Sequence, residues 1–221
     1  MRTVIFDLDG TLADTSADLI AAANRALAEG GVGARLDARV DALTAFQGGR
    51  AMLRLALARA GRADDVAVVE ALFPVLLDAY AADIDRHTRL YPGALAAVEW
   101  LAEAGYGLGI CTNKPAALAE TLLTRLGVRG LFGALVGADS LPVRKPDPAP
   151  YRAAVEAVGG VVARSLLVGD TETDRATARA AGVPCVLVGF GPEGAGVARL
   201  APEAVIAAYE ELPATVARLI G

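Results

Sequence analysis

Short runs rich in apolar and β-branched residues alternate along most of this chain with longer segments of helical periodicity. The short runs are Thr3–Asp7, Leu108–Thr112, Ala134–Gly137, Leu166–Asp170 and Cys185–Gly189. The helical segments are Gly93–Ala104, Pro115–Leu126, Pro148–Val158 and Thr173–Ala181. Strands that alternate with helices in this order predict a parallel sheet with helices on both faces. We therefore expect an α/β fold with a doubly wound, Rossmann-like core.

One long stretch after the first run interrupts this order. Its helical patterns are Ala17–Glu29, Gly49–Ala60 and Asp65–Asp83. Glycine-rich turns separate these patterns, and none of the intervening segments favours a strand. We therefore expect two domains: an α/β core formed by residues 1–14 and 89–221, and an all-α domain inserted at residues 15–88.

Composition and charge argue against several classes of partner. The 221 residues carry a net charge of −5, whereas a surface that binds nucleic acid needs an excess of basic residues. No stretch approaches the roughly 20 apolar residues that a membrane span needs. The apolar run at the N-terminus becomes acidic too soon for a signal peptide. We expect a cytoplasmic protein, either a monomer or a homodimer, with no nucleic-acid or membrane partner.

The cysteine and histidine content limits the possible chemistry further. Cys111 and Cys185 lie far apart in strand-like stretches, which favours buried free thiols in a reducing compartment over a disulfide. His87 is the only histidine, so a histidine-ligated zinc site or Ser-His-Asp catalysis has little support. Any metal ion is expected to be a hard cation bound by oxygen atoms.

Polar residues gather where the predicted strands end. They are Asp7, Asp9 and Gly10 after the first run, Thr112, Asn113 and Lys114 after the second, Lys145 after the third, and Asp170 and Asp174 after the fourth. Ligands of parallel α/β sheets bind at the carboxyl ends of the strands, so we expect three of the carboxylates, a threonine and a lysine to converge at one edge. Neighbouring carboxylates repel one another unless a cation or a proton intervenes. Carboxylates suit Mg²⁺, and a lysine with a threonine hydroxyl suits phosphate oxygens. These residues therefore indicate a Mg²⁺-dependent phosphoryl-transfer site.

Four motifs, in the same order along the chain, resemble those of the haloacid dehalogenase-like (HAD) phosphohydrolases. They are FDLDGTLADT at 6–15, CTNKP at 111–115, KPDP at 145–148 and VGDTETD at 168–174. The helical insert after the first motif resembles the family's subgroup with a helical cap. The resemblance covers essentially the whole chain, and it implies an enzyme that hydrolyses a small phosphate ester with residues 15–88 as the cap.

The resemblance also implies a role for each matching residue. Asp7 would attack phosphorus and become an aspartyl-phosphate, and Asp9 would protonate the leaving alcohol and then activate water. Asp170 would bind Mg²⁺ together with Asp7 and the Asp9 carbonyl. The residues that would hold the phosphoryl oxygens are Thr112, the backbone of Asn113, and Lys145.

Two residues of the motifs, Asp174 and Lys114, also fit purely structural roles. Thr171 and Asp174 fit a helix-capping pattern, which would make Asp174 purely structural. The family resemblance instead puts Asp174 against Lys145 or in the second shell of the metal. Lys114 is interpreted as a solvated residue at a helix start, with no part in catalysis.

The segment Gln47–Arg50 in the helical insert also has two interpretations. It fits an ordinary loop between helices. Alternatively, it contacts the substrate: the backbone at Gly49 approaches the ligand closely, and Arg50 binds a carboxylate through two hydrogen bonds.

The absence of certain residues narrows the range of possible reactions and substrates. Phosphonate hydrolysis of the phosphonoacetaldehyde type needs a cap lysine, and the insert has none. The lysine–histidine arrangement of the sugar-phosphate mutases is not visible, and dehalogenases keep only one aspartate of the Asp7–Asp9 pair. Three segments look most like those of bacterial phosphoglycolate phosphatases: LYPG at 90–93, GICTNKP at 109–115 and the stretch that begins with GGR at 48–50. This resemblance implies 2-phosphoglycolate as the substrate, with Arg50 on its carboxylate. Another small phosphate ester such as N-acetylmuramate 6-phosphate, pyrophosphate, or a non-catalytic phosphate-binding module on the same fold stay open as alternatives.

Overall fold

The chain forms two compact units in the computed structural model, which describes all of residues 1–221. One unit consists of residues 1–14 and 90–221, and the other of residues 15–89. The second boundary thus lies one residue after the one expected from the sequence. Two short strands at the points where the chain passes between the units, β2 (Ala13–Asp14) and β3 (Arg89–Leu90), form a separate two-stranded sheet.

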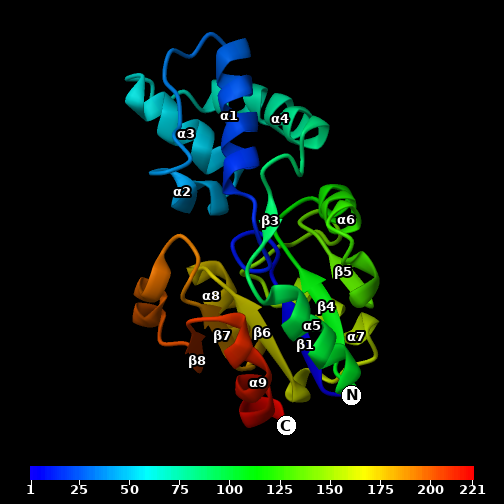
Figure 1. Ribbon diagram of the computed structural model, residues 1–221. Helices are drawn as coiled ribbons and strands as arrows, with labels where there is room; N and C mark the ends of the chain where they lie inside the picture. Colours follow the sequence, from blue (N-terminus) through cyan, green and yellow to red (C-terminus); the bar gives the residue numbers. More distant parts are fainter. The chain divides into compact units, whose positions relative to one another are not determined.

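The larger unit contains a six-stranded parallel sheet with the order β5–β4–β1–β6–β7–β8 (Figure 1). The strands are β1 (Thr3–Phe6), β4 (Gly107–Cys111), β5 (Ala134–Val136), β6 (Ser165–Gly169), β7 (Cys185–Val188) and β8 (Ala204–Ile206). β1 pairs with β4 on one side and with β6 on the other, both in parallel. The carboxyl ends of these three strands therefore lie side by side. The expected α/β fold is confirmed.

Helices pack against the sheet from two sides. They are α5 (Ala94–Glu103), α6 (Ala116–Arg125), α7 (Ala149–Ala157), α8 (Glu172–Ala181) and α9 (Leu212–Ile220). α7 packs on β4, β5 and α8, whereas α5 packs on β4 and α9. The short 3₁₀ helices are η1 (Arg129–Leu131), η2 (Val162–Arg164), η3 (Gly194–Leu200) and η4 (Tyr209–Glu211). The sequence did not predict β8 or α9: β8 is an edge strand in which only Ile206 is fully buried, and α9 buries only Leu212 and Val216.

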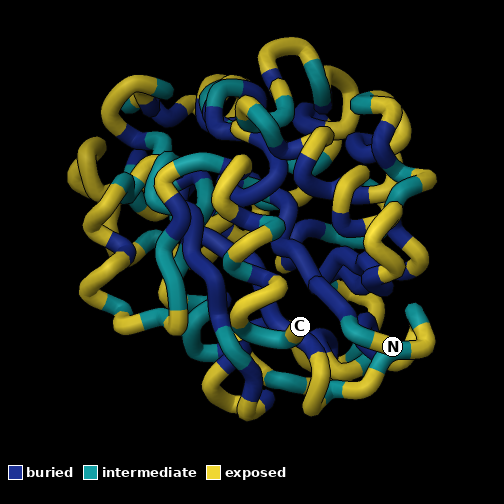
Figure 2. Tube along the Cα trace, turned by 60° about the horizontal axis from the view of Figure 1, so that its bottom comes forward, coloured by how far each residue is buried: buried dark blue, intermediate teal, exposed yellow.

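The strands around the site are buried along their whole length. Every residue of β1, β4, β6 and β7 is buried, and Figure 2 shows such stretches in dark blue. In one core cluster, Tyr151 and Val155 from α7 pack with Ile5 and Leu167 from the sheet. Burying a large apolar side chain contributes about 1.5–3 kcal/mol to the free energy of unfolding. The well-packed core therefore holds the strand ends, which carry the polar residues, in fixed positions.

The smaller unit, residues 15–89, is helical. Its helices are α1 (Ser16–Glu29), α2 (Ala42–Phe46), α3 (Gly49–Arg59) and α4 (Val66–Ala82). α1 buries Ile20, Ala23 and Leu27 on one face and packs against α4, which also contacts α3. This i, i+3, i+7 spacing is the apolar stripe of an amphipathic helix. None of the protein's helices combines the length and apolar character that crossing a membrane would require.

Candidate active site

The loop after β1 carries the first two aspartates. Asp7 directly follows β1, and the main-chain N–H groups of residues 11–13 donate hydrogen bonds of 3.0–3.4 Å to the Leu8 carbonyl. Gly10 has a φ of +81°, and a Cβ atom at this position would collide with the Asp170 carboxylate. A glycine is required here because the loop turns through a left-handed conformation and passes directly against Asp170.

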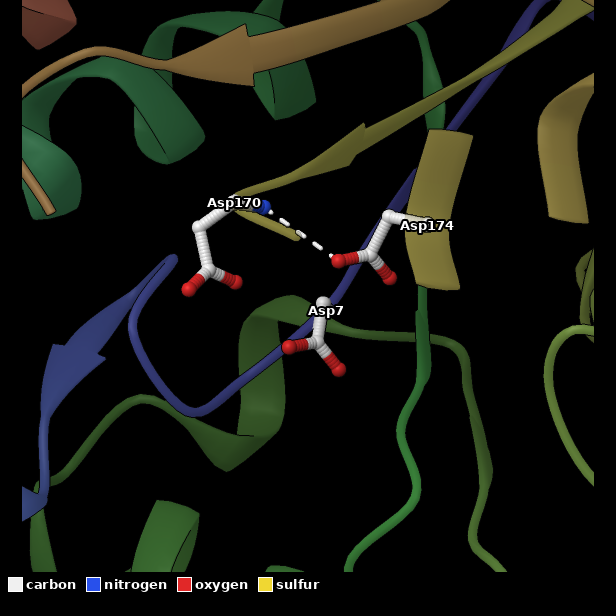
Figure 3. A group of neighbouring side chains, drawn as sticks. All are labelled: Asp7, Asp170 and Asp174. Atoms are coloured by element: carbon white, nitrogen blue, oxygen red, sulfur yellow. Dashed lines mark hydrogen bonds between the residues drawn. The ribbon is translucent and has the colours of Figure 1, made fainter. Parts of the chain in front are cut away.

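Three buried carboxylates converge at this edge of the sheet. They come from Asp7 after β1, Asp170 after β6 and Asp174 in the first turn of α8, and oxygens of all three lie within 4.8 Å of one another (Figure 3). Their sequence separation is closed by the parallel pairing of β1 with β6. The expected convergence at the strand ends is therefore present for these three residues.

Lys145 neutralises part of this negative charge. Its Nζ donates to Asp7 Oδ1 at 2.7 Å and to Asp174 Oδ1 at 2.6 Å, and its side chain is 3% exposed. Burial alone would lower the pKa of the ammonium group, but the carboxylates of Asp174 and Asp7 outweigh it and raise the pKa above its ordinary value. Lys145 is therefore a permanent cation that joins two of the three carboxylates.

Asp174 combines the two roles between which the sequence left a choice. Its Oδ2 accepts hydrogen bonds from the Thr171 hydroxyl at 2.7 Å, the Thr171 N–H at 3.1 Å and the Asp170 N–H at 3.3 Å. Its Oδ1 binds Lys145. Asp174 closes the capping box at the start of α8 and at the same time fixes the Lys145 ammonium group.

The carboxylates remain in excess over the cations that touch them. Burial first, and then the neighbouring charges of Asp174 and Asp9, raise the pKa of Asp7 to about 7, although Lys145 acts in the opposite direction. Burial, together with the charges of Asp174 and Asp7, also raises the pKa of Asp170 well above its ordinary value. Buried oxygens with uncompensated negative charge are the donor set of a hard divalent cation. The cluster can therefore hold a metal ion.

Two of the residues expected to hold phosphate, Thr112 and Asn113, lie at the end of β4. The Thr112 hydroxyl is buried and accepts a hydrogen bond of 3.1 Å from the Lys114 N–H. The Asn113 side chain donates to the Lys145 carbonyl at 3.0 Å. This bond ties the loop that carries Lys145 to the β4 end, so that both segments face the same edge.

The interpretation of Lys114 as a solvated residue is wrong. Its side chain is only 4% exposed, and its Nζ donates to Asp9 Oδ1 at 2.7 Å. Lysine side chains are mostly exposed and are almost never fully buried unless their charge is paired. Here the parallel pairing of β1 with β4 brings the helix start against the Asp7–Asp9 loop.

Sequence reasoning also missed two residues that support Asp170, one by direct contact and the other through the first. The Thr11 hydroxyl donates to Asp170 Oδ1 at 2.9 Å, and the hydroxyl of the buried Tyr209 donates to the Thr11 carbonyl at 2.7 Å. Phe190 packs between the rings of Tyr209 and Tyr91, with centroid distances of 5.3 and 5.1 Å. No local pattern marks Tyr209, which lies in η4, outside the four motifs.

The two remaining candidates, Gly49 and Arg50, lie in the smaller unit at the start of α3. Both Nε and one terminal nitrogen of Arg50 donate to Glu70 at 2.8 Å. The guanidinium carbon also lies 3.7 Å from the centre of the Phe73 ring. A Cβ atom at Gly49 would come within 2.9 Å of that ring. Arg50 thus presents the paired geometry that binds carboxylates, here engaged with Glu70.

Comparisons with known proteins agree with these motifs. The sequence pattern of the family described as haloacid dehalogenase-like hydrolase matches residues 4–188. A phosphoglycolate phosphatase of Mesorhizobium japonicum is 40% identical over 98% of this chain and 96% of its own length. One of Rhodospirillum rubrum is 41% identical over 96% of this chain and 89% of its own. The crystal structure of a predicted phosphoglycolate phosphatase from Haemophilus somnus, 25% identical, matches with a TM-score of 0.83 over 97% of each chain.

Proposed function

The chain belongs to the haloacid dehalogenase-like hydrolases, and on this premise we propose that it is a Mg²⁺-dependent phosphatase acting on 2-phosphoglycolate. The observation that carries the proposal is the position of Asp7. Its buried carboxylate follows the central strand, accepts a hydrogen bond from Lys145 and lies beside Asp170. An aspartate in this setting can attack a phosphorus atom whose charged oxygens are held by neighbouring cations.

The donor set fits Mg²⁺. In the proposed site, the carboxylates of Asp7 and Asp170 and the main-chain carbonyl of Asp9 would hold the ion, which would supply positive charge to the phosphoryl oxygens. Asp174 is assigned to the surroundings of the metal rather than to its ligands, because its two oxygens already accept four hydrogen bonds. Its part is to hold Lys145 and the backbone of Asp170 in place.

The reaction proceeds in two steps. In the first, a bond forms between an Asp7 carboxylate oxygen and phosphorus, and the bond between phosphorus and the ester oxygen breaks. The Asp9 carboxyl group gives its proton to that ester oxygen, so the product leaves as an alcohol. Lys145, the Thr112 hydroxyl and the Asn113 N–H donate hydrogen bonds to the phosphoryl oxygens. In the second, Asp9 takes a proton from water, the water oxygen attacks phosphorus, and the bond to Asp7 breaks.

The choice of 2-phosphoglycolate rests on two supports. Relatives about 40% identical over nearly the full chain are phosphoglycolate phosphatases. This substrate also carries a carboxylate, and Arg50 in the smaller unit has the guanidinium geometry for binding one. We assign residues 15–89 as the cap that selects the leaving group, with Gly49 and Arg50 as its contact residues.

Phosphate release over a panel of substrates tests the proposal. The panel contains 2-phosphoglycolate, other small phosphate esters and pyrophosphate, each with Mg²⁺ and with EDTA. We expect the highest kcat/KM for 2-phosphoglycolate, no turnover in EDTA, and none for Asp7→Asn. A higher kcat/KM for another ester or for pyrophosphate would replace the substrate and keep the mechanism. Absence of turnover across the panel would leave a phosphate-binding module, and turnover by Asp7→Asn would overturn the role of Asp7.

A further inference from the structure

The chain has only two lysines, and each is bonded to one aspartate of the Asp7–Asp9 pair. Lys145 Nζ binds Asp7 Oδ1 and Lys114 Nζ binds Asp9 Oδ1, both at 2.7 Å. Both lysine side chains are at least 96% buried. Apart from the single histidine, all other basic side chains of the chain are arginines. Lysine supplies a compact ammonium group on a flexible stem, whereas arginine needs room for a planar fork.

The backbone of Lys114 is held on both sides of its side chain. Its N–H donates to the Thr112 hydroxyl at 3.1 Å, and its carbonyl accepts from the Ala138 N–H at 2.9 Å. These bonds fix the stem at the end of β4, next to β1. A charge-assisted hydrogen bond from such an anchored group is shorter and stronger than a neutral one and tolerates less rotation of its acceptor.

We propose that Lys114 is a positioning residue for Asp9. Its bond to Oδ1 fixes the plane of the Asp9 carboxyl group and so determines where the second oxygen, Oδ2, exchanges a proton with the leaving ester oxygen and later with water. This inference rests on the proposed function, because that function makes Asp9 the proton donor and acceptor. In this proposal Lys145 binds the nucleophile Asp7, and Lys114 orients the acid–base residue Asp9.

The proposal predicts which reactions depend on Lys114. An alkyl phosphate needs a proton on its leaving oxygen, so loss of Lys114 should slow the first step. 4-Nitrophenyl phosphate releases a stable phenolate without a proton, so its first step should hardly change. Its second step still needs Asp9 to take a proton from water and should slow. Loss of Lys114 should therefore produce a burst of nitrophenolate, one per site, followed by slow turnover.

The experiment compares wild type with Lys114→Met, Asp9→Asn and the double variant in rapid-mixing assays with Mg²⁺. We expect Lys114→Met to lose about 10²-fold in the first step with 2-phosphoglycolate, within the usual range for a proton-transfer residue. With 4-nitrophenyl phosphate its burst rate should stay close to that of wild type, because this leaving group needs no proton. The double variant should be no slower than Asp9→Asn alone, because Lys114 acts only through Asp9.

Several results would overturn this role. Equal losses in the first step for both substrates would mean that Lys114 contacts phosphate or merely supports the fold. Losses that multiply in the double variant would mean that it acts independently of Asp9. Lys114→Gln keeps an uncharged N–H donor on a side chain one atom shorter than lysine. It should retain more activity than Lys114→Met, and it serves if the methionine variant does not fold. Inorganic phosphate binding, measured by calorimetry, should be unchanged in both. Failure of the proposed function itself would be distinct, because wild type would then show no Asp7-dependent turnover.

Discussion

The hydroxyl of Tyr209 donates a hydrogen bond of 2.7 Å to the carbonyl of Thr11, 198 residues earlier in the chain. Both groups are buried. The Thr11 hydroxyl in turn donates to Asp170 Oδ1. A residue near the C-terminus is thereby connected, through one intermediate residue, to a carboxylate that we assign to the metal site. Such outer partners orient the groups that bind a metal directly.

Tyr209→Phe is expected to weaken Mg²⁺ binding as well as the fold. It leaves the buried Thr11 carbonyl without its phenol partner, which should lower the free energy of unfolding by about 1–3 kcal/mol. The Mg²⁺ dissociation constant, measured by calorimetric titration, should rise by about 3–10-fold, less than the 10–100-fold loss typical of a ligand's direct partner.

Tyr151→Phe is the matched control for this variant. Tyr151 is equally buried, and its hydroxyl shares a 2.6 Å hydrogen bond with the Ser165 hydroxyl, in the core cluster behind the sheet. It should lose comparable stability without a change in Mg²⁺ affinity. Equal Mg²⁺ affinities for the Tyr209 and Tyr151 variants would show that the connection to Asp170 has no effect on the metal.

Residues of the site differ in how far the sequence could reveal them. Asp7 and Asp170 were predictable because each ends an apolar run, and parallel strands bring their carboxyl ends to one edge. Tyr209 and the bond between Lys114 and Asp9 were not, because the partners lie 198 and 105 residues away. Tyr209 lies outside the four motifs, and the motif CTNKP that contains Lys114 does not show which way the lysine side chain points. Most helices and the central strands follow from periodicity, whereas β8 lies at the edge of the sheet and has only one fully buried residue, Ile206, so its sequence shows no clear apolar run.

Asp170→Asn should stabilise the metal-free protein. The pKa of Asp170 is raised in the folded state, mainly by burial, so the folded protein keeps this proton to higher pH than the unfolded chain does. The contribution of Asp170 to the free energy of unfolding is therefore fully present below the ordinary carboxyl pKa of about 4. It is lost as the pH rises through the raised pKa of Asp170 in the folded protein. Asn removes this penalty and can still accept from Thr11. We expect a gain of about 0.5–2 kcal/mol at pH 7 in EDTA.

Addition of Mg²⁺ should reverse that order. Ligand binding stabilises by RT ln(1 + [L]/Kd), which is about 2.7 kcal/mol at a hundredfold excess over Kd. Wild type should gain this stability in denaturant titrations, and Asp170→Asn should gain little. Stabilisation of Asp170→Asn by Mg²⁺ to the wild-type extent would exclude Asp170 as a ligand.

Asp174→Asn should destabilise the metal-free protein, in contrast to Asp170→Asn. Asp174 accepts four hydrogen bonds, one of them from the buried Lys145, so the asparagine NH₂ must face a donor on one side. Breaking a buried ion pair by removing one partner costs about 3–5 kcal/mol. Thr171→Val, which removes only the hydroxyl at the start of α8, should cost about 1 kcal/mol. Similar losses for the two variants, measured by chemical denaturation, would reduce Asp174 to a helix cap.

Arg50→Ala tests whether the smaller unit recognises the substrate carboxylate. We expect kcat/KM for 2-phosphoglycolate to fall by about 10²-fold, since a charge-assisted pair contributes roughly 1.5–3 kcal/mol. The kcat/KM for ethyl phosphate, which lacks the carboxylate, should fall much less.

Glu70→Ala breaks the same Arg50–Glu70 ion pair from the other side and is the matched control. This pair is largely exposed, so its loss alone should cost at most about 1 kcal/mol of stability. If Arg50 binds the substrate, Glu70→Ala keeps the guanidinium group and should retain most of the activity on 2-phosphoglycolate. If Arg50 only braces α3 against α4, the two variants should fall together, and the ratio between the two substrates should stay at its wild-type value.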